Sequence, residues 1–353
     1  RMKKLSLLLA VSMLMTLLAG CGGGASSGSG GPSSGSSPGA GTSQAAAGAY
    51  VIANTPKCVG ISWWDRMLVG NDRFVASTGN EVYQVGPAGQ SDTAVQVSTI
   101  EDVIATGVDA ITVIPSDPDA VETTLAKARE QGIVVISHEA EGMQNVDYDL
   151  EAFVNREYGA HMMDVLAKEM GEEGGYCIMM GMLTMSSHQQ WTEGAIERQK
   201  EAYPNMYMVC DPVESQAGGG SQEGSYKVAK EVIASYPDVA GFIGCDMVNP
   251  PGIAMAVEEA GKAGEIAVTG TCLVSVAGEY LTNGTIKTIC FWDPADAGEA
   301  MCSLATKVLG GEEIKDGIDL GVPGFESCKL EGNTLFGSAW VDVTTENMAD
   351  YNF

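Results

Sequence analysis

From Tyr50 onward, short runs of apolar and β-branched residues alternate with longer segments of helical periodicity. The runs are YVIAN, EVYQVG, DAITVIP, IVVISHE, EAFVN, YCIMMG, MYMVCD, VAGFIGCD, EIAVTGT and IKTICFW, which are typical of strands in parallel sheets. Segments 96–107, 119–132 and 224–238 carry apolar residues at i, i+3, i+4 and i+7, which predicts helices. The alternation predicts βαβ units and an α/β fold.

Polar and glycine residues mark the predicted helix ends. Asp117 and Asp119 stand where N-caps belong, because a short side chain there can accept a backbone N–H bond. Gly107, Gly132 and Gly261 follow helical stretches, where the chain needs a positive φ. These signals support the helix assignments.

Ten strands are more than a single sheet of one domain usually holds. We therefore expect two parallel sheets, each flanked by helices, in two lobes. In open α/β sheets, ligands bind beyond the carboxyl ends of the strands. The residues that follow strands are Lys57, Trp63, Trp64, Pro115, Ser116, His138, Glu139, Asn155, the segment 184–191, Asp246, Trp292 and Asp293.

The loop after the first predicted strand has the sequence PKCVGISWW. Lys57 is either a solvated lysine or a donor of up to three hydrogen bonds to ligand hydroxyls. Trp63 and Trp64 are either core residues or flat surfaces that stack on the apolar face of a sugar ring. Because they are adjacent, we expect one indole to face the core and the other a cleft.

Glu139 ends the fourth predicted strand, within SHEAEG. Its carboxylate could accept hydrogen bonds from two hydroxyls of one sugar, or it could belong to an exposed acidic loop. His138 and Glu139 resemble the start of a zinc-protease motif, but no second histidine stands at the required spacing.

The segment TMSSHQQWTEG is the densest polar and aromatic cluster in the chain. Ser186 or Ser187 is either a helix N-cap or a ligand group. His188 and Gln189 add donors and acceptors that an N-cap does not need, and Trp191 is expected to pack beneath them.

Asn155, Asp246 and Trp292 repeat the same arrangement of a strand followed by a polar or indole side chain. From Tyr50 onward there is no GxSxG elbow, no Walker A, no GxGxxG fingerprint after a strand and no HExxH motif. The glycine-rich AGGGSQEG (217–224) lacks the Lys-Ser/Thr ending of a phosphate loop and is predicted to be an ordinary loop. The sequence therefore favours binding over catalysis.

Residues 1–20 have the pattern of a signal peptide. Arg1, Lys3 and Lys4 precede an apolar stretch from 5 to 18. Leu-Ala-Gly-Cys then ends at Cys21, which resembles a bacterial lipobox and predicts lipidation of that thiol. The alternative is an ordinary cleaved leader with a chance cysteine.

Residues 21–49 are rich in Gly, Ser, Ala and Pro and carry no charge, which predicts a flexible tether. A lipid on Cys21 would hold the folded domain outside the cytoplasmic membrane, anchored to it rather than spanning it. The net charge of −27, from 46 acidic and 19 basic residues, argues against nucleic acid or an anionic bilayer surface as a partner.

Nine cysteines in an exported chain raise the question of disulfides, but those beyond Cys21 show no CxxC or metal-ligand spacing. Cys177, Cys210, Cys245 and Cys290 lie in or beside strand-like runs, where a free thiol behaves as a small hydrophobic residue. We expect mostly reduced structural cysteines, no metal and no cofactor.

Four stretches together resemble the type I periplasmic sugar-binding proteins, near the rhamnose-binding and autoinducer-2-binding subunits of ABC importers. They are IEDVIATGVDAITVIPSDPDAVETTLAKAREQGIVVIS, WTEGAIERQKEAYPN, ICFWDPADAGEAM and TENMADYNF. The resemblance covers residues 50–353 and implies two Rossmann-like lobes joined by a three-strand hinge. It implies an N-terminal lobe of 50–154 plus 290–325 and a C-terminal lobe of 155–289 plus 326–353.

The autoinducer-2 binders have a proline, a ligand-binding lysine and an aromatic pair in the opening loop, matched here by Pro56, Lys57 and Trp63–Trp64. Glu139 stands where they have an aspartate. Ser187–His188 stands where they have an Asp-Gln pair, which removes a carboxylate and leaves the ligand open.

The resemblance implies binding without chemistry by a monomeric subunit that docks on an ABC permease with its ATPase. Hydroxyls of a small sugar or furanose-like ligand would be held by Glu139, Asn155, His188, Gln189 and Asp246, with indoles covering its apolar faces. The alternatives are uptake of autoinducer 2, a sugar-sensing module that feeds a membrane receptor, and, least favoured, a glycosidase on the same fold.

Overall fold

The computed structural model describes residues 49–218 and 220–353. The predicted signal peptide, Cys21 and the predicted tether as far as residue 48 lie outside these described residues. Among the described helices, none combines the length and the apolar character that crossing a membrane requires.

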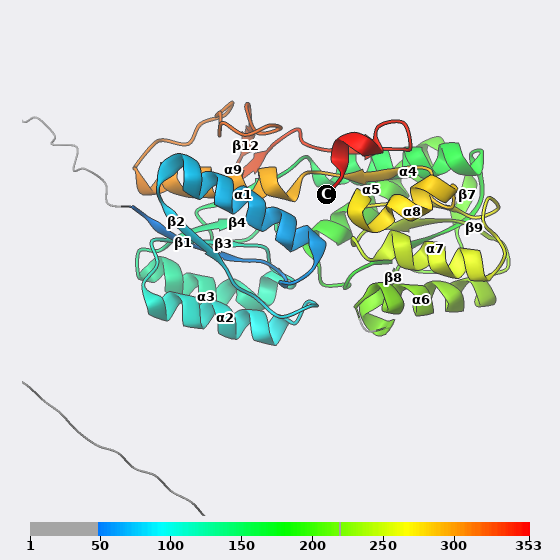
Figure 1. The fold of residues 1–353 in the computed structure, drawn as a ribbon, viewed down its shortest axis with the longest axis horizontal. Helices are drawn as coiled ribbons and strands as arrows, with labels where there is room; N and C mark the ends of the chain where they lie inside the picture. The colour runs from blue at the N-terminus through cyan, green and yellow to red at the C-terminus, as the bar shows by residue number, and fades with distance from the viewer. Residues whose placement is uncertain (1–48, 219) are drawn as a thin grey trace, which may run out of the picture. The chain divides into compact units, whose positions relative to one another are not determined.

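The first lobe is built on a seven-stranded sheet in the order β12-β13-β5-β4-β3-β1-β2, parallel except for the β12–β13 pair. Helices α1 and α9 cover one face and α2 and α3 the other (Figure 1). The elements are β1 (Val51–Thr55), α1 (Ser62–Thr78), β2 (Glu81–Gln84), α2 (Thr93–Thr106), β3 (Ala110–Val113), α3 (Pro118–Glu130), β4 (Val134–Ser137), β5 (Tyr148–Glu151), α9 (Pro294–Leu309), β12 (Lys329–Glu331) and β13 (Thr334–Phe336).

The second lobe is built on a parallel sheet in the order β10-β9-β6-β7, with the short β8 also paired to β6. Its elements are α4 (Asn155–Met170), β6 (Glu173–Met180), α5 (Ser186–Ala202), β7 (Asn205–Met208), β8 (Val213–Glu214), the 3-10 helix η1 (Ser215–Gly218), α6 (Gln222–Ser235), β9 (Val239–Gly244), α7 (Asn249–Glu259), β10 (Ala267–Gly270) and α8 (Val274–Asn283). Helix α4 packs against α5, and α6 packs against α7. The mainly parallel sheets show the predicted α/β class.

The chain passes between the lobes at three places: residues 152–154, the residues after β11 (Ile289–Phe291), and residues 337–340 before β14 (Val341–Val343). Strands β11 and β14 pair antiparallel beside these crossings. The sequence boundaries put 326–353 in the second lobe, and the structure corrects this for β12 and β13. Strand β13 pairs with β5 of the first sheet and β12 pairs with β13, while the 3-10 helix η2 (Met348–Tyr351) packs on α8.

The local sequence explains the boundaries of these elements. All four residues of β3 are buried, as its run of apolar and β-branched residues predicts for a central parallel strand. Asp117 caps α3 by accepting from the Ala120 amide, whereas Asp119 lies inside the first turn. Gly107 ends α2 with φ of 74°. The predicted strand EAFVN is displaced, because β5 ends at Glu151 and α4 begins at Asn155.

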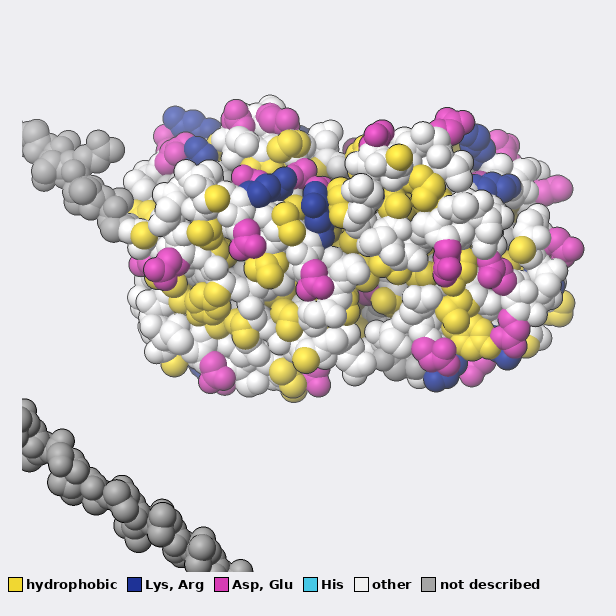
Figure 2. Space-filling view, viewed as in Figure 1, with side chains coloured by type: hydrophobic (Ala, Val, Ile, Leu, Met, Phe, Trp, Pro, Cys, Tyr) yellow, Lys and Arg dark blue, Asp and Glu magenta, His cyan; other side chains and the backbone are white. Residues whose placement is uncertain are grey.

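The surface is strongly acidic, and Asp and Glu side chains are spread over both lobes on the face shown in Figure 2. The eight cysteines among the described residues are free thiols, and all but Cys210 are buried. The described cysteines therefore act as small core side chains in this structure.

Helix α4 crosses α5 at two glycines that permit close backbone contact. A Cβ on Gly159 would lie 1.9 Å from the Trp191 carbonyl oxygen, and one on Gly194 would lie 2.1 Å from that of Arg156. At either distance a Cβ would overlap the carbonyl oxygen, so this crossing requires glycine on both helices.

Two buried acids of β5 support the loop that carries Glu139. Asp149 accepts from the Ser137 hydroxyl at 2.7 Å, and Glu151 accepts from the Ala140 amide at 2.9 Å. Burial raises the pKa of both carboxyls, and the second carboxyl of the pair raises that of Glu151 further. The pair therefore retains a proton where exposed acids have lost theirs.

We expect Gly159→Ala to lower the free energy of unfolding by about 1–3 kcal/mol, because the new methyl group overpacks the α4–α5 crossing. Chemical denaturation measures this change. Gly278→Ala is the matched control, since its Cβ meets nothing closer than 3.5 Å within α8. The control should be neutral or gain up to about 1 kcal/mol. Equal stability of the two variants would contradict the close crossing.

We expect Glu151→Gln to become increasingly more stable than the native protein as the pH rises from 5 to 8. Carboxyls with a raised folded-state pKa contribute most stability below their unfolded value, near about 4, and lose it as pH rises through the folded value. The difference should grow by up to about 1.4 kcal/mol per pH unit for one proton. Unfolding curves at each pH measure it, with the exposed Glu130→Gln as control. Parallel pH profiles would show that the pair holds no extra proton.

Candidate functional site

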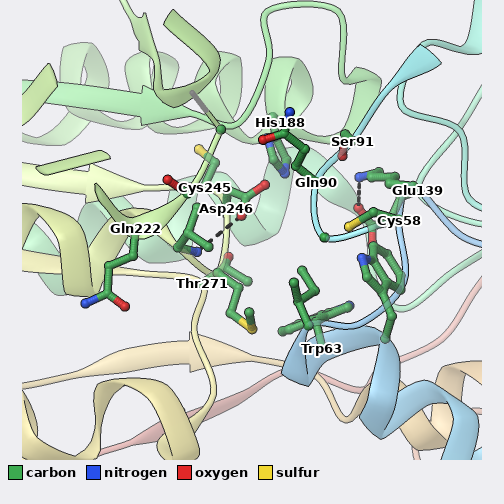
Figure 3. Close-up of a pocket in the computed structure, with 18 of the residues that line it drawn as sticks. Cys58, Trp63, Gln90, Ser91, Glu139, His188, Gln222, Cys245, Asp246 and Thr271 are labelled. Carbon is green, nitrogen blue, oxygen red and sulfur yellow. Dashed lines mark hydrogen bonds and ion pairs between the residues drawn. The ribbon is translucent and has the colours of Figure 1, made fainter. Parts of the chain in front are cut away.

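A cavity of about 250 Å³ lies between the lobes, at the carboxyl ends of strands from both sheets. Its volume is just below the roughly 300–1,000 Å³ of pockets for drug-sized ligands, so its occupant is small. In Figure 3, Glu139, Cys58 and Ser91 project from the first lobe, and Asp246, Cys245 and Thr271 project from the second. Of the sequence-predicted residues, seven line it: Lys57, Trp63, Trp64, Glu139, His188, Asp246 and Trp292.

A buried ion pair forms the wall from the first lobe. Lys57 Nζ lies 2.6 Å from Glu139 Oε2, and each residue is 4% exposed. Ser187, from α5 of the other lobe, donates to the same carboxylate oxygen at 3.1 Å. The ammonium group of Lys57 has further N–H donors beyond the one that bonds Glu139. The pair therefore offers a ligand both a cationic donor and an anionic acceptor.

The backbone at Glu139 has a positive φ of 55°, one of only two non-glycine residues described with this geometry. Such geometry is uncommon for a residue with a Cβ and is found at functional sites. Burial is the largest single influence and acts to raise the pKa of Glu139, but the charge and hydrogen bond of Lys57, together with the neighbouring histidines, outweigh it and hold the pKa below its usual value. Glu139 is therefore a carboxylate at neutral pH.

His188 is held as a neutral ring. Its Nδ1 accepts from the Gly181 amide at 3.2 Å, which places the ring proton on Nε2. Burial, and after it the charge of Lys57, lower the pKa of His188 to about 3. The ring therefore presents a neutral N–H donor at the cavity wall.

Asp246 supplies the carboxylate of the second lobe. Its Oδ1 accepts from the Val248 amide at 3.2 Å, and its own amide donates to Asn249 Oδ1 at 2.9 Å. A Cβ on Gly181 would lie 2.5 Å from Asp246 Oδ2, so glycine there leaves room for the carboxylate. Burial raises the pKa of Asp246. A hydroxyl donor from a ligand would satisfy this partly desolvated group.

Indoles form the apolar part of the wall. Trp63 and Trp64 are each 5% exposed, and both line the cavity, whereas the sequence predicted that one would face the core. The Trp63 and Trp292 rings meet edge to face at 4.7 Å. Trp292 Nε1 is buried with no acceptor among the described residues. The indoles therefore give the wall flat apolar surface, while Nε1 of Trp292 lies buried behind it.

Four predicted residues are not brought to the cavity wall. Asn155 accepts from Trp191 Nε1 at 2.7 Å, and His138 Nδ1 contacts the Leu150 carbonyl. Ser187 is turned to Glu139, and Gln189 donates to the Leu183 carbonyl at 2.6 Å. Each is occupied by a protein partner that sequence position alone does not reveal.

The start of α5 decides between the two alternatives for Ser186 and Ser187 by excluding the N-cap. Met185 occupies the N-cap position without a side-chain cap, so neither Ser186 nor Ser187 caps the helix. Trp191 was expected to pack beneath the site, and it lines the cavity while its indole N–H holds Asn155. The polar cluster is therefore used for contacts between lobes and for ring packing.

Several wall residues were not among the side-chain contacts predicted from the sequence: Cys58, Ile61, Gln90, Ser91, Gln222, Cys245, Met247, Val248 and Thr271. Cys245 and Thr271 directly follow β9 and β10, so the strand-end rule could have found them. Gln90 and Ser91 lie in the longer loop between β2 and α2, which carried no distinctive signal. Burial raises the pKa of Cys58 to about 12, so this wall sulfur is a neutral thiol.

Taken together, the wall has two carboxylates from opposite lobes, a lysine, a neutral histidine and four tryptophans. Among the described residues, no set of three metal-ligating groups converges on this cavity. The arrangement suits a small uncharged molecule with several hydroxyls and an apolar face.

Comparison with known proteins places the chain in a family. Residues 52–313 match the family model described as a periplasmic binding protein domain. The D-ribose/D-allose-binding protein of Pseudomonas aeruginosa is 28% identical over 268 residues, which cover 70% of this chain and 76% of that protein.

Two solved structures share the fold. LsrB from Clostridium saccharobutylicum, in complex with AI-2, has a TM-score of 0.78 at 20% identity and covers 86% of this chain and 100% of its own. An ABC transporter solute-binding protein from Clostridium phytofermentas, with bound L-rhamnose, has a TM-score of 0.79 at 19% identity and covers 87% and 99%. These relatives are solute-binding proteins and not enzymes. The chain therefore belongs to the periplasmic binding protein family.

Proposed function

We propose that this protein is the solute-binding subunit of a sugar-type ABC importer and captures one small polyol, of about monosaccharide size, between its lobes. The observation that carries the proposal is the placement of Glu139 and Asp246, one from each lobe, around a cavity walled by indoles. Carboxylates accept strong hydrogen bonds from hydroxyls, and indole faces cover the C–H side of a sugar ring.

Ligand capture is proposed to work by differential affinity. A polyol that bonds Glu139 and Asp246 together favours the arrangement in which the lobes are close. Ser187 already reaches Glu139 across the lobes, and Thr184 donates to the Ser116 carbonyl at 3.4 Å. The closed form would then dock on the permease.

A furanose-like signal such as autoinducer 2 is the second candidate ligand. It is favoured by Lys57, which the sequence resemblance implies to be a ligand contact and which lines the cavity with Trp63 and Trp64. It is disfavoured by Ser187 and His188, which stand where those binders carry Asp-Gln. A sensing role, with the closed form presented to a membrane receptor, would use the same site.

The proposed location is outside the cytoplasmic membrane, held there by a lipid on Cys21. This proposal rests on the leader, the Leu-Ala-Gly-Cys sequence and the uncharged tether. The proposed partners are an ABC permease and its ATPase, with the protein acting as a monomer and without a resident cofactor.

The function is tested by thermal shift and calorimetry against pentoses, hexoses, L-rhamnose, polyols and autoinducer 2. At a concentration 100 times its Kd, a true ligand stabilises the folded state by about 2.7 kcal/mol. We expect at least one small polyol to bind with 1:1 stoichiometry and to be recovered unchanged. No binding across the panel would contradict import of a small sugar, and recovery of an altered ligand would indicate an enzyme.

We expect Asp246→Asn to weaken binding of that ligand by about 10- to 100-fold, because it removes one charge-assisted acceptor. Asn keeps an oxygen for the Val248 amide, so folding should be little affected. Asp246 is preferred over Lys57 because removing Lys57 would strand the buried charge of Glu139. Asp211→Asn, an exposed change in the same lobe, is the control. Equal affinities of the two variants would place the ligand elsewhere.

A further inference from the structure

A second group of chemically reactive side chains lies beside the lobe crossings, apart from the sugar-type cavity. His161 of α4, Cys290 of β11 and Asp342 of β14 place a nitrogen, a sulfur and an oxygen within 4.8 Å of one another. They are far apart in sequence, so no short motif announces them. Only the packing of three separate elements brings them together.

The pairing of β11 with β14 fixes the relative positions of Cys290 and Asp342. Cys290 stands opposite Asp342 in the antiparallel ladder, which directs both side chains to the same face. His161 approaches from α4, and its Nε2 lies 2.8 and 2.9 Å from the two Asp342 oxygens. The three candidate ligand atoms therefore converge because of how the backbone elements are paired and packed. Their convergence does not rest on side-chain rotamers alone.

The ring of His161 is held in place by its neighbour Trp340. The two rings stack with centroids 5.4 Å apart and planes 16° from parallel. Cys290 is fully buried, while the side chains of His161 and Asp342 are 26% and 39% exposed. The group thus has a buried sulfur at its base and an open side through which an ion and a water could enter.

We propose that His161, Cys290 and Asp342 form a binding site for a divalent cation of the zinc class, with water as the fourth ligand. Imidazole, thiolate and carboxylate are the ligands that zinc takes, at about 2.0–2.3 Å. Tetrahedral coordination at those lengths separates ligand atoms by roughly 3.3–3.8 Å. The present separations reach this range through side-chain shifts of about 1 Å.

The chemistry of binding balances without any other reactant. The ion replaces the thiol proton of Cys290 and the Nε2 proton of the His161 imidazolium, whose ring keeps its other proton on Nδ1, and both displaced protons go to solvent. No electron is transferred, because Zn²⁺ has no redox chemistry. The same contacts exist without the ion as a hydrogen-bonded pair, so the fold does not depend on it.

The proposed ion site lies beside all three segments that cross between the lobes. α4 follows the first crossing, β11 precedes the second and β14 follows the third. An ion held by one residue from each would tie the three crossing segments together on the side of the second lobe. The site would therefore stiffen the base on which the lobes move, without contacting the cavity that holds the proposed ligand.

The test is titration of the purified full chain with Co²⁺ and Zn²⁺. We expect one Co²⁺ per chain, with a thiolate-to-cobalt charge-transfer absorption that one equivalent of Zn²⁺ removes. Cys290→Ser should abolish the absorption, and His161→Gln should weaken Zn²⁺ binding by more than about tenfold, since even supporting residues of metal sites cost that much. Cys302→Ser, another fully buried cysteine, is the control and should keep both properties.

His161→Gln keeps the proposal testable if Cys290→Ser does not fold, because His161 is partly exposed on a helix surface. Absence of charge-transfer absorption in the native chain would overturn the proposal. Absorption that survives in Cys290→Ser, or Zn²⁺ affinity unchanged in folded His161→Gln, would overturn it as well, by placing the ion on other groups. None of these outcomes depends on which sugar the cavity binds.

Discussion

The buried ion pair between Lys57 and Glu139 is the interaction on which the organisation of the site depends. Removing two charges from water costs several kcal/mol per ion, and their mutual attraction offsets this only with good geometry and further hydrogen bonds. The structure supplies these from both lobes: Ser187 bonds the same carboxylate, and Glu151 fixes the amide of the next residue, Ala140. A charged group is thereby held in place, at a strained backbone position, where the two lobes meet.

A continuous aromatic core surrounds the lobe crossings and joins the two halves of the cavity. Trp292 contacts the rings of Trp63 from α1, Phe153 from the first crossing and Trp191 from α5. Dense packing of this kind resists small distortions. Closure of the lobes is therefore expected to occur as a rigid-body change about the crossings. The same packing presents indole surface to a ligand while Asn155 Oδ1 and His138 Nδ1 are held by protein partners.

The rule that ligands bind beyond the carboxyl ends of parallel strands identified the main charged residues of the cavity. Its failures have a common cause. It placed Lys57, Glu139 and Asp246 correctly at the cavity, since the carboxyl ends of parallel strands share one edge. It could not separate Glu139 from His138, because adjacent residues at a strand end point in different directions. It also missed β12 and β13, whose short runs return to the first sheet after a long excursion through α9.

The sequence by itself determined the α/β class, the helix ends at Asp117 and Gly107, the two-lobed plan and the set of strand ends at which a ligand would bind. These follow from local periodicity and from rules that every parallel sheet obeys. Only the tertiary structure decided which polar groups face the cavity and which are consumed inside the protein. It also decided that His161, Cys290 and Asp342 meet beside the crossings. Such contacts depend on packing angles and on register between segments far apart in the sequence. The local pattern of apolar and polar residues determines neither of these.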